Sequence, residues 1–187
     1  SFTFVASVEV IALLGLKPIV VDVDSDTFLM KTQDVEASLS ARTKVIIPVH
    51  LFGQCVDMKS LMQVARSRDL YVIEDNAQAI GARCLNAVGK MQMAGTIGHI
   101  GCTSFYPSKN LGCYGDGGAI FTNDDKIANI IRSCRVHGMG RDKYENIRIG
   151  MTGRLDTMQA VVLDAKLDIF ADELVHRQNA ADRYAAL

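Results

Sequence analysis

The sequence lacks the features of several large classes of protein. It has no run of five or more basic residues, and its 20 lysines and arginines nearly balance 21 aspartates and glutamates in 187 residues. Proteins that bind nucleic acid need a surface that neutralises phosphates, so this balance argues against a nucleic-acid partner. There is also no stretch of about 18 uncharged apolar residues, which argues against a membrane span.

Disulfide and metal signatures are missing as well. The five cysteines form no C-x-x-C pair and lie mostly in apolar or strand-like surroundings, so we expect reduced packing residues. This cysteine usage predicts a cytoplasmic protein. The four histidines are dispersed without helical i, i+4 pairing, and no metal site is predicted. The chain opens without Met and stops within a helical pattern, which predicts a fragment of a longer protein.

What is present is a regular alternation of apolar runs and helical patterns, in a chain that is 49% hydrophobic. Strands are predicted at 18–23, 44–49, 70–75, 100–105 and 118–122, and helices at 5–15, 33–40, 57–68, 123–135 and 155–187. Asp57 is predicted to cap the helix that runs to about Arg68, and Asn123 and Asp124 are predicted to cap the helix that runs to about Arg135. The glycine-containing segment 82–99 is interpreted as an irregular excursion or hairpin, and 136–148 as an exposed loop. This order predicts an α/β fold whose mostly parallel central sheet has helices on both faces. Pro48 weakly disfavours a central place for its strand.

Two polar residues follow predicted strands. Lys109 lies in a turn after the 100–105 strand and is followed by a glycine-rich run at 111–118. A lysine there can anchor a carbonyl cofactor covalently, although a solvated surface lysine is the plain alternative. Asp75 ends the 70–75 strand, at the sheet edge where open α/β folds bind ligands; a helix N-cap is its alternative. Together they are the two groups that pyridoxal phosphate (PLP) requires, a Schiff-base lysine and a carboxylate for the ring nitrogen.

Six ordered motifs resemble those of the DegT/StrS family of PLP-dependent nucleotide-sugar aminotransferases. They are TFVAS (3–7), PVHLFGQ (48–54), EDNAQ (74–78), SFYPSKN (104–110), GDGG (115–118) and RLDTMQA (154–160). The resemblance implies the large domain of a fold type I PLP-dependent transferase. Residues 1–154 would form a PLP-binding core that is incomplete at its N-terminus. Residues 155–187 would form a long helix that leads towards a missing C-terminal domain.

The resemblance also implies a role for each site residue. Lys109 would carry the Schiff base and then move the substrate proton as general base and acid. Asp75 would pair with the pyridinium nitrogen, and Gln78 would hydrogen-bond the ring hydroxyl. Ser104 would bind the cofactor phosphate, and Phe4 would stack on the pyridine ring. The plain alternatives are a surface glutamine at 78, a serine bonded to its own backbone at 104, and a core phenylalanine at 4.

One departure concerns the expected contact across a subunit boundary. Family members usually carry a Gly-x-Asn-x-Arg segment that reaches the neighbouring subunit's cofactor phosphate, whereas this chain has Thr152 in place of the Asn. Thr152 keeps a hydroxyl donor and loses the amide. Arg154 would serve the same contact, or else form a surface salt bridge. The resemblance therefore implies a homodimer whose site is completed across the interface.

The expected reaction moves an amino group from an amino acid, with glutamate as the first choice, to a keto group of a nucleotide-linked sugar. The runs 111–125 and 166–170 look most like enzymes that aminate the 3-keto group of a UDP-linked N-acetylglucosamine-derived uronic acid. Alternatives are a sugar dehydratase of the family, a regulatory or scaffold relative without turnover, and another fold type I enzyme. The dehydratases carry histidine where this chain has Lys109, which argues against them. The sugar, its keto position and the pathway stay open at this point.

Overall fold

The computed structural model describes residues 2–142 and 144–187, and the chain divides into two compact units. Unit 1 comprises Ser1–Thr103 and Ala119–Ile130, and unit 2 comprises Ser104–Gly118 and Ile131–Leu187. The division between a core and a helix at residue 154 stays a prediction.

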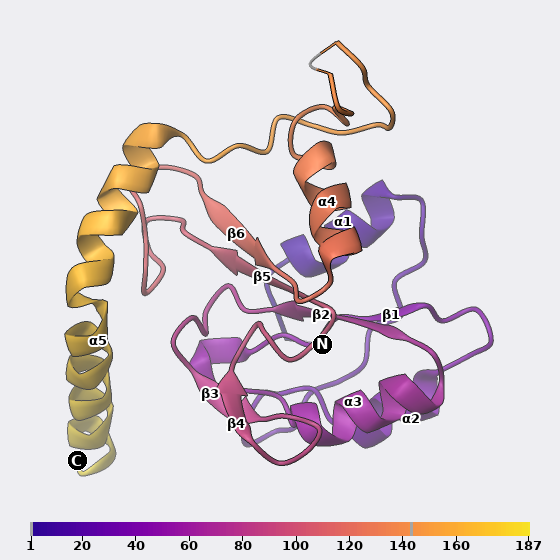
Figure 1. The fold of residues 1–187 in the computed structure, drawn as a ribbon. Helices are drawn as coiled ribbons and strands as arrows, with labels where there is room; N and C mark the ends of the chain where they lie inside the picture. Colours follow the sequence, from indigo (N-terminus) through magenta and orange to yellow (C-terminus); the bar gives the residue numbers. More distant parts are fainter. Residues whose placement is uncertain (1, 143) are drawn as a thin grey trace. The chain divides into compact units, whose positions relative to one another are not determined.

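A four-stranded sheet, drawn in Figure 1, forms the centre of unit 1. Its order is β1 (Val45–Ile46), β2 (Tyr71–Asp75), β5 (Ile100–Ser104) and β6 (Gly118–Phe121). β2 is parallel to both β1 and β5. β6 runs against β5, because the Phe105 N–H donates to the Gly117 carbonyl and the Thr122 hydroxyl donates to the His99 carbonyl. The predicted mostly parallel α/β sheet is therefore confirmed, with one antiparallel strand.

Helices cover both faces of this sheet within unit 1 (Figure 1). On one face lie α2 (Thr32–Ser38) and α3 (Met58–Ser67), and α3 buries Leu61 and Ala65 against Ile46 and Val72 of the strands. The predicted N-cap of α3 is confirmed, since the Asp57 carboxylate accepts a hydrogen bond from the Ser60 N–H. On the other face lies α1 (Ala6–Leu13), which ends before Gly15 in the left-handed conformation (φ 68°).

The segment between β2 and β5 is a hairpin, as one of the two interpretations had it. Strand β3 (Arg83–Leu85) pairs antiparallel with β4 (Met91–Met93). After β6, helix α4 (Asp125–Cys134) begins where the Asp124 carboxylate accepts hydrogen bonds from two backbone amides, as predicted.

Two strand predictions need correction. Residues 18–23 form no strand, and their only backbone bridge among the described residues joins Val23 to Met30. Their β-branched composition favours extended chain, but a strand also needs a neighbour to pair with, and this run has no ladder. The strand predicted at 44–49 is only Val45–Ile46. Its ladder to β2 is interrupted because Pro48 has no N–H to donate, and β1 is an edge strand, as the proline indicated.

Unit 2 contains the turn between β5 and β6, the irregular segment that follows α4, and helix α5 (Thr157–Ala185). The long helical pattern noted in the sequence thus corresponds to one continuous helix, in which Leu163 is the only buried residue among those described. None of the helices, over the residues that the structure describes, has both the length and the apolar character needed to cross a membrane.

Candidate functional site

Asp75 closes β2 in unit 1 and is half-buried. Its Oδ2 accepts a short hydrogen bond from the hydroxyl of Ser7 in α1, and its Oδ1 accepts one from the Ala77 N–H at 3.1 Å. The second contact closes a local turn, and because no helix begins directly after Asp75, the helix N-cap alternative is wrong. The first contact links the strand end to the helix on that face, so the carboxylate is held in one orientation by groups from two elements.

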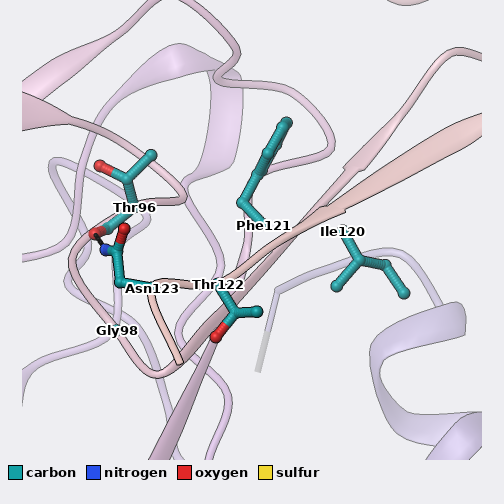
Figure 2. A pocket seen from close by; sticks show the side chains of 6 residues that line it. All are labelled: Thr96, Gly98, Ile120, Phe121, Thr122 and Asn123. Carbon is teal, nitrogen blue, oxygen red and sulfur yellow. Dashed lines mark hydrogen bonds between the residues drawn. The ribbon is translucent and has the colours of Figure 1, made fainter. Parts of the chain in front are cut away.

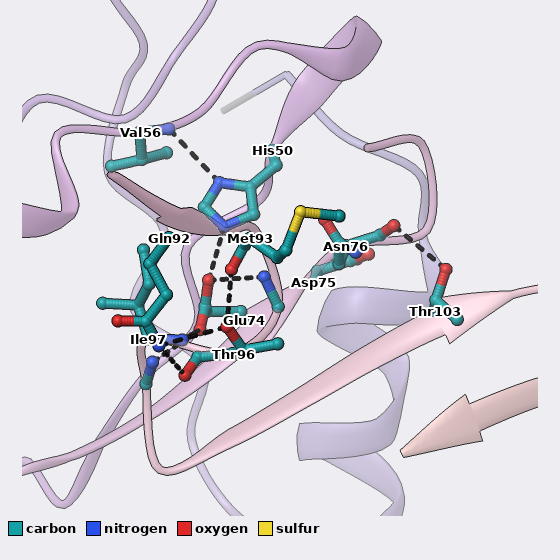
Figure 3. A network of polar contacts seen from close by, with 12 residues as sticks. His50, Val56, Glu74, Asp75, Asn76, Gln92, Met93, Thr96, Ile97 and Thr103 are labelled. Carbon is teal, nitrogen blue, oxygen red and sulfur yellow. Dashed lines mark hydrogen bonds and ion pairs between the residues drawn. The ribbon is translucent and has the colours of Figure 1, made fainter. Parts of the chain in front are cut away.

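The adjacent acid has a different role. Side chains alternate along a strand, so Glu74 points to the opposite face from Asp75 and is fully buried. Figure 3 shows its contacts. Oε2 accepts from His50 Nε2 at 2.9 Å and from the Gly95 N–H at 2.8 Å, while Oε1 accepts from the Ile97 and Gly98 N–H groups. Glu74 therefore anchors the turn before β5.

The protonation of this pair follows from its donors. The Val56 N–H donates to Nδ1 of His50, so Nδ1 carries no proton and the ring is neutral with its hydrogen on Nε2. Burial raises the pKa of Glu74, but the hydrogen bonds from His50, Gly98 and Gly95 outweigh it and leave the pKa below its ordinary value. The carboxylate is thus ionised, and it is satisfied inside the core without a formal cation.

Gln78 lies three residues after Asp75 and is bound through its oxygen. Its Oε1 accepts from the Phe52 N–H at 2.8 Å. Phe52 adopts a left-handed backbone (φ 57°), which is uncommon for an aromatic residue and turns this N–H towards the amide. Because the oxygen is engaged, the amide's NH₂ group is the end that remains to donate to a ligand.

Phe4 precedes α1 and is 69% exposed, so the core-packing alternative for this residue is wrong in unit 1. The neighbouring Thr3 has a buried hydroxyl oxygen without a hydrogen-bond partner among the described residues. A buried hydroxyl is usually satisfied, so this oxygen is a position where a ligand can bind.

Lys109 lies in unit 2, in the turn that follows β5. Its N–H donates to the Tyr106 carbonyl at 2.9 Å, which folds the chain back at this point. Gly112 lies against the carbonyls of Tyr106 and Pro107 so closely that a Cβ would overlap them. The hydroxyl oxygen of Ser104 accepts from the Tyr106 N–H at 3.2 Å, as its local alternative predicted, and its proton remains to be donated.

Lys109 lines a cavity of about 270 Å³ that lies within unit 2. Other lining groups include Lys166, Glu173 and Arg177 of α5. The Lys166 ammonium donates to the Gly112 carbonyl and lies 4.9 Å from the centre of the Tyr114 ring. Lys166 therefore ties the turn that carries Lys109 to α5.

Thr152 and Arg154 lie before α5, and both are exposed. The Thr152 hydroxyl lies 2.8 Å from Nε2 of His137, a residue with a left-handed backbone (φ 56°). The hydroxyl group of Thr152 is thus hydrogen-bonded to another residue of unit 2.

A family model for the DegT/DnrJ/EryC1/StrS aminotransferases matches residues 1–187. The chain belongs to this family. A UDP-2-acetamido-2-deoxy-3-oxo-D-glucuronate aminotransferase from Pseudomonas aeruginosa is 48% identical over 183 residues, which are 98% of this chain and 49% of that protein. A "pleiotropic regulatory protein" from Geobacillus stearothermophilus is 44% identical over 188 residues, 100% of this chain and 49% of that protein.

Solved structures agree with the family assignment. A DegT DnrJ EryC1 StrS aminotransferase from Brucella abortus superposes with a TM-score of 0.92 at 47% identity, over 98% of this chain and 50% of that one. The expected fold of the family is thereby confirmed. The chain spans about half the length of the curated relatives it matches.

A second cavity, of about 330 Å³, lies in unit 1 beside β6 (Figure 2). Its polar groups are largely engaged in hydrogen bonds within the protein. The Asn123 amide donates to the Thr96 carbonyl and the Thr122 hydroxyl to the His99 carbonyl. None of the residues selected from the family motifs lines this cavity.

Sequence reasoning missed three residues that shape the site. Ser7 was visible only as the last residue of the TFVAS motif, and Glu74 only as the neighbour of Asp75. Lys166 fell in a helical run with no polar pattern of its own. In each case the partner is distant in sequence, so spacing alone gives no signal for the contact.

Proposed function

We propose that the protein containing this chain binds PLP and transfers an amino group from an amino acid to a keto group of a nucleotide-linked sugar. The observation that carries the proposal is Lys109, which lies in a closed turn and lines a cavity in a chain of the aminotransferase family. PLP supplies an aldehyde that binds amines and a ring that accepts electrons. The side chains of the protein would anchor and orient this cofactor and move the proton.

Lys109 is proposed as the covalent anchor and as the group that moves the proton. A primary amine can hold an aldehyde and, once released from it, take and return a proton as general base and acid. Lys166 fixes the backbone turn that carries Lys109 by donating a hydrogen bond to the Gly112 carbonyl from α5.

Three residues of unit 1 carry the kinds of group that the polar atoms and the ring of PLP need. Asp75, oriented by Ser7, would hold the ring nitrogen in its protonated form. Gln78 would donate from its NH₂ group to the ring hydroxyl, since its oxygen is taken by Phe52. Phe4 has an exposed ring that can stack on an aromatic ligand.

The phosphate is assigned to residues of unit 2. Ser104 would donate its hydroxyl proton to a phosphate oxygen, because its own oxygen already accepts from Tyr106. Thr152 and Arg154, both exposed, would contact the phosphate of a second subunit, which makes a homodimer the proposed assembly. Localisation in the cytoplasm stays a prediction.

The proposed substrate class follows from the relative that is 48% identical, whose name states a UDP-linked 3-oxo sugar acid. We take UDP-2-acetamido-2-deoxy-3-oxo-D-glucuronate as the first acceptor to test and glutamate as the first donor. The resemblance of runs 111–125 and 166–170 to enzymes of this kind supports the same choice.

The test uses the full-length protein. Incubation with PLP should give a visible absorption band and, after borohydride reduction, a cofactor adduct on Lys109 by peptide mass spectrometry. Lys109→Ala should lose both. With glutamate and the keto sugar, one 2-oxoglutarate should form for each amino sugar. A protein that stays colourless with PLP, or that reduces no adduct onto Lys109, contradicts the proposal.

A regulatory role is the second candidate, because a relative that is 44% identical over the whole chain is named as a regulatory protein. The two candidates differ in one measurement. A transaminase loses its absorption band when glutamate alone is added, as the amino group is taken up. A regulatory relative would bind PLP and keep the band unchanged. A dehydratase would turn over the sugar without consuming the donor.

A further inference from the structure

Three phenylalanines from separate segments of unit 1 meet in an aromatic cluster, which comprises Phe2, Phe28 and Phe52. The centre of the Phe2 ring lies 5.3 Å from that of Phe28 and 6.3 Å from that of Phe52. Both separations are those of favourable aromatic pairs, and the Phe2–Phe52 pair is T-shaped. All three side chains are exposed, so the cluster lies outside the hydrophobic core. Phe2 therefore joins the turn before α2 to the turn after β1 by ring contacts alone.

Two of these rings stand on strained backbone. Phe28 (φ 58°) and Phe52 (φ 57°) both adopt the left-handed conformation, which a residue with a bulky side chain rarely adopts. Such strain persists only where the surrounding contacts hold it. The turn of Phe28 is closed by local hydrogen bonds, since the Asp24 carboxylate accepts from two backbone N–H groups and its carbonyl accepts from the Phe28 N–H. This turn is thus a firm support for the ring of Phe2.

The strain at Phe52 has a direct consequence for Gln78. The left-handed backbone points the Phe52 N–H at the Gln78 amide oxygen, which accepts it at 2.8 Å. The turn also packs on Gln78, because a Cβ on Gly53 would lie 3.7 Å from the Gln78 carbonyl oxygen. If Phe52 relaxed to an ordinary backbone conformation, its N–H would point elsewhere and the amide would be free to turn round.

We propose that the aromatic cluster positions Gln78 for the cofactor. Phe2, supported by its contact with Phe28, holds Phe52 in the left-handed conformation. The Phe52 N–H then keeps the oxygen end of the Gln78 amide, so that the NH₂ end is presented to the ring hydroxyl of PLP. Phe2 and Phe52 are positioning residues that act through Gln78. This inference rests on the proposed function, to which it adds a support for the cofactor that lies outside the contacts themselves.

The first measurement needs no cofactor. In the full-length protein without PLP, Phe2→Ala should speed hydrogen exchange at the Phe52 N–H by about fivefold or more, because its contact with Gln78 opens more often. The His50 N–H, which donates to the Asp75 carbonyl at 3.0 Å, should exchange as in the parent protein and so report that the rest of the unit is intact. Phe2→Tyr keeps the ring and should restore the parent rate. Equal exchange at Phe52 in the parent and in Phe2→Ala overturns the proposal.

The second measurement is a double-mutant cycle on the affinity for PLP, determined by absorption titration. Phe2→Ala should weaken binding by about threefold to tenfold, at most the effect of one lost hydrogen bond, and Phe2→Tyr should restore it. In a Gln78→Ala background, Phe2→Ala should cause no further loss, because it acts through Gln78. A general structural effect of Phe2 would weaken binding equally in both backgrounds, and that result overturns the proposal. Tyr184→Ala, at another exposed aromatic residue, is the control and should bind PLP as the parent does.

The results distinguish this inference from the proposed function. A parent protein that forms no PLP adduct on Lys109 contradicts the proposed function, and the positioning of Gln78 for PLP with it. A parent protein that binds PLP, with neither exchange nor affinity changed in Phe2→Ala, overturns the positioning role alone. If Phe2→Ala does not fold, Phe28→Ala removes the support beneath Phe2 and is subject to the same two measurements.

Discussion

The Glu74 carboxylate and the His50 imidazole meet in the core, with 2.9 Å between Oε2 and Nε2 and neither residue exposed. His50 lies in the segment that follows β1 and Glu74 lies in β2, so their contact joins that segment to β2 on the face opposite Asp75. Because the Val56 N–H occupies Nδ1, the histidine is neutral and serves as a donor. The site carboxylate therefore stands on a strand whose other face is fixed by a buried charge.

Removing this charge should destabilise the protein strongly. In Glu74→Ala, three backbone N–H groups and His50 lose their acceptor inside the core. Breaking a buried, hydrogen-bonded pair from one side costs roughly 3–5 kcal/mol. Glu36→Ala, at an exposed position of α2, should change the free energy of unfolding by no more than about 0.5 kcal/mol. Urea unfolding measures both; equal effects of the two variants would contradict the assignment.

The same carboxylate predicts an acid-dependent loss of stability. Its folded-state pKa lies below the ordinary value of 4.5, since the hydrogen bonds to it outweigh its burial. A group with a lowered folded pKa stabilises fully above its unfolded pKa, and that contribution is lost as pH falls through the folded value. The free energy of unfolding should therefore decline as the pH drops below about 4.5. Asp57 also has a lowered pKa, so the difference between parent and Glu74→Gln isolates Glu74. A parallel decline in both proteins would show that other groups cause it.

Local patterns predicted most of the fold, and they failed where a distant partner decides the outcome. Asp57 and Asp124 were recognisable as helix caps because a cap needs only the next turn. Residues 18–23 have strand composition but form no ladder, since pairing depends on a neighbour that composition does not reveal. For the candidate site, the sequence predicted that Asp75 ends a strand and that Lys109 lies in the turn after the next strand of the sheet. The contacts of Ser7 and Lys166 were not, because they span 68 and 54 residues of sequence.

Gly101, the second residue of β5, should tolerate no side chain. A Cβ there would overlap the backbone carbonyl of Gly95, in the turn that Glu74 holds in place. The backbone of Gly95 and that of β5 cannot move apart, so Gly101→Ala should lower the free energy of unfolding by about 3 kcal/mol or more. Gly89 is a useful comparison because a Cβ there would meet no other atom within 4 Å, although the backbone is left-handed (φ 77°). Gly89→Ala should cost only about 1 kcal/mol, from backbone strain alone. Thermal unfolding ranks the two, and a milder effect at 101 would contradict the close approach.

Gln78→Glu separates the structural and the cofactor roles of this side chain. The carboxylate keeps an oxygen for the Phe52 N–H, so the free energy of unfolding should change by about 0.5 kcal/mol or less. It loses the NH₂ donor, so PLP should bind about tenfold more weakly, as expected for one lost hydrogen bond of about 1.4 kcal/mol. Absorption titration of the full-length protein with PLP gives the affinity. An unchanged affinity for PLP would show that Gln78 does not donate a hydrogen bond to the ring hydroxyl.

Lys166 should prove important for the turn that carries Lys109. Its ammonium donates to the Gly112 carbonyl and lies over the Tyr114 ring, so Lys166→Met removes a charged hydrogen bond and a cation–π contact while keeping the aliphatic stem. Losing the charged hydrogen bond should cost about 1.5–3 kcal/mol, felt locally in unit 2. Hydrogen exchange should therefore speed up at the amides of Lys109 and Cys113, whose bonds close the turn. Lys126→Met, on the exposed start of α4, is the control and should leave these amides unchanged. If both variants exchange like the parent, the turn is closed by its own backbone, and the tie to α5 contributes nothing to holding the lysine.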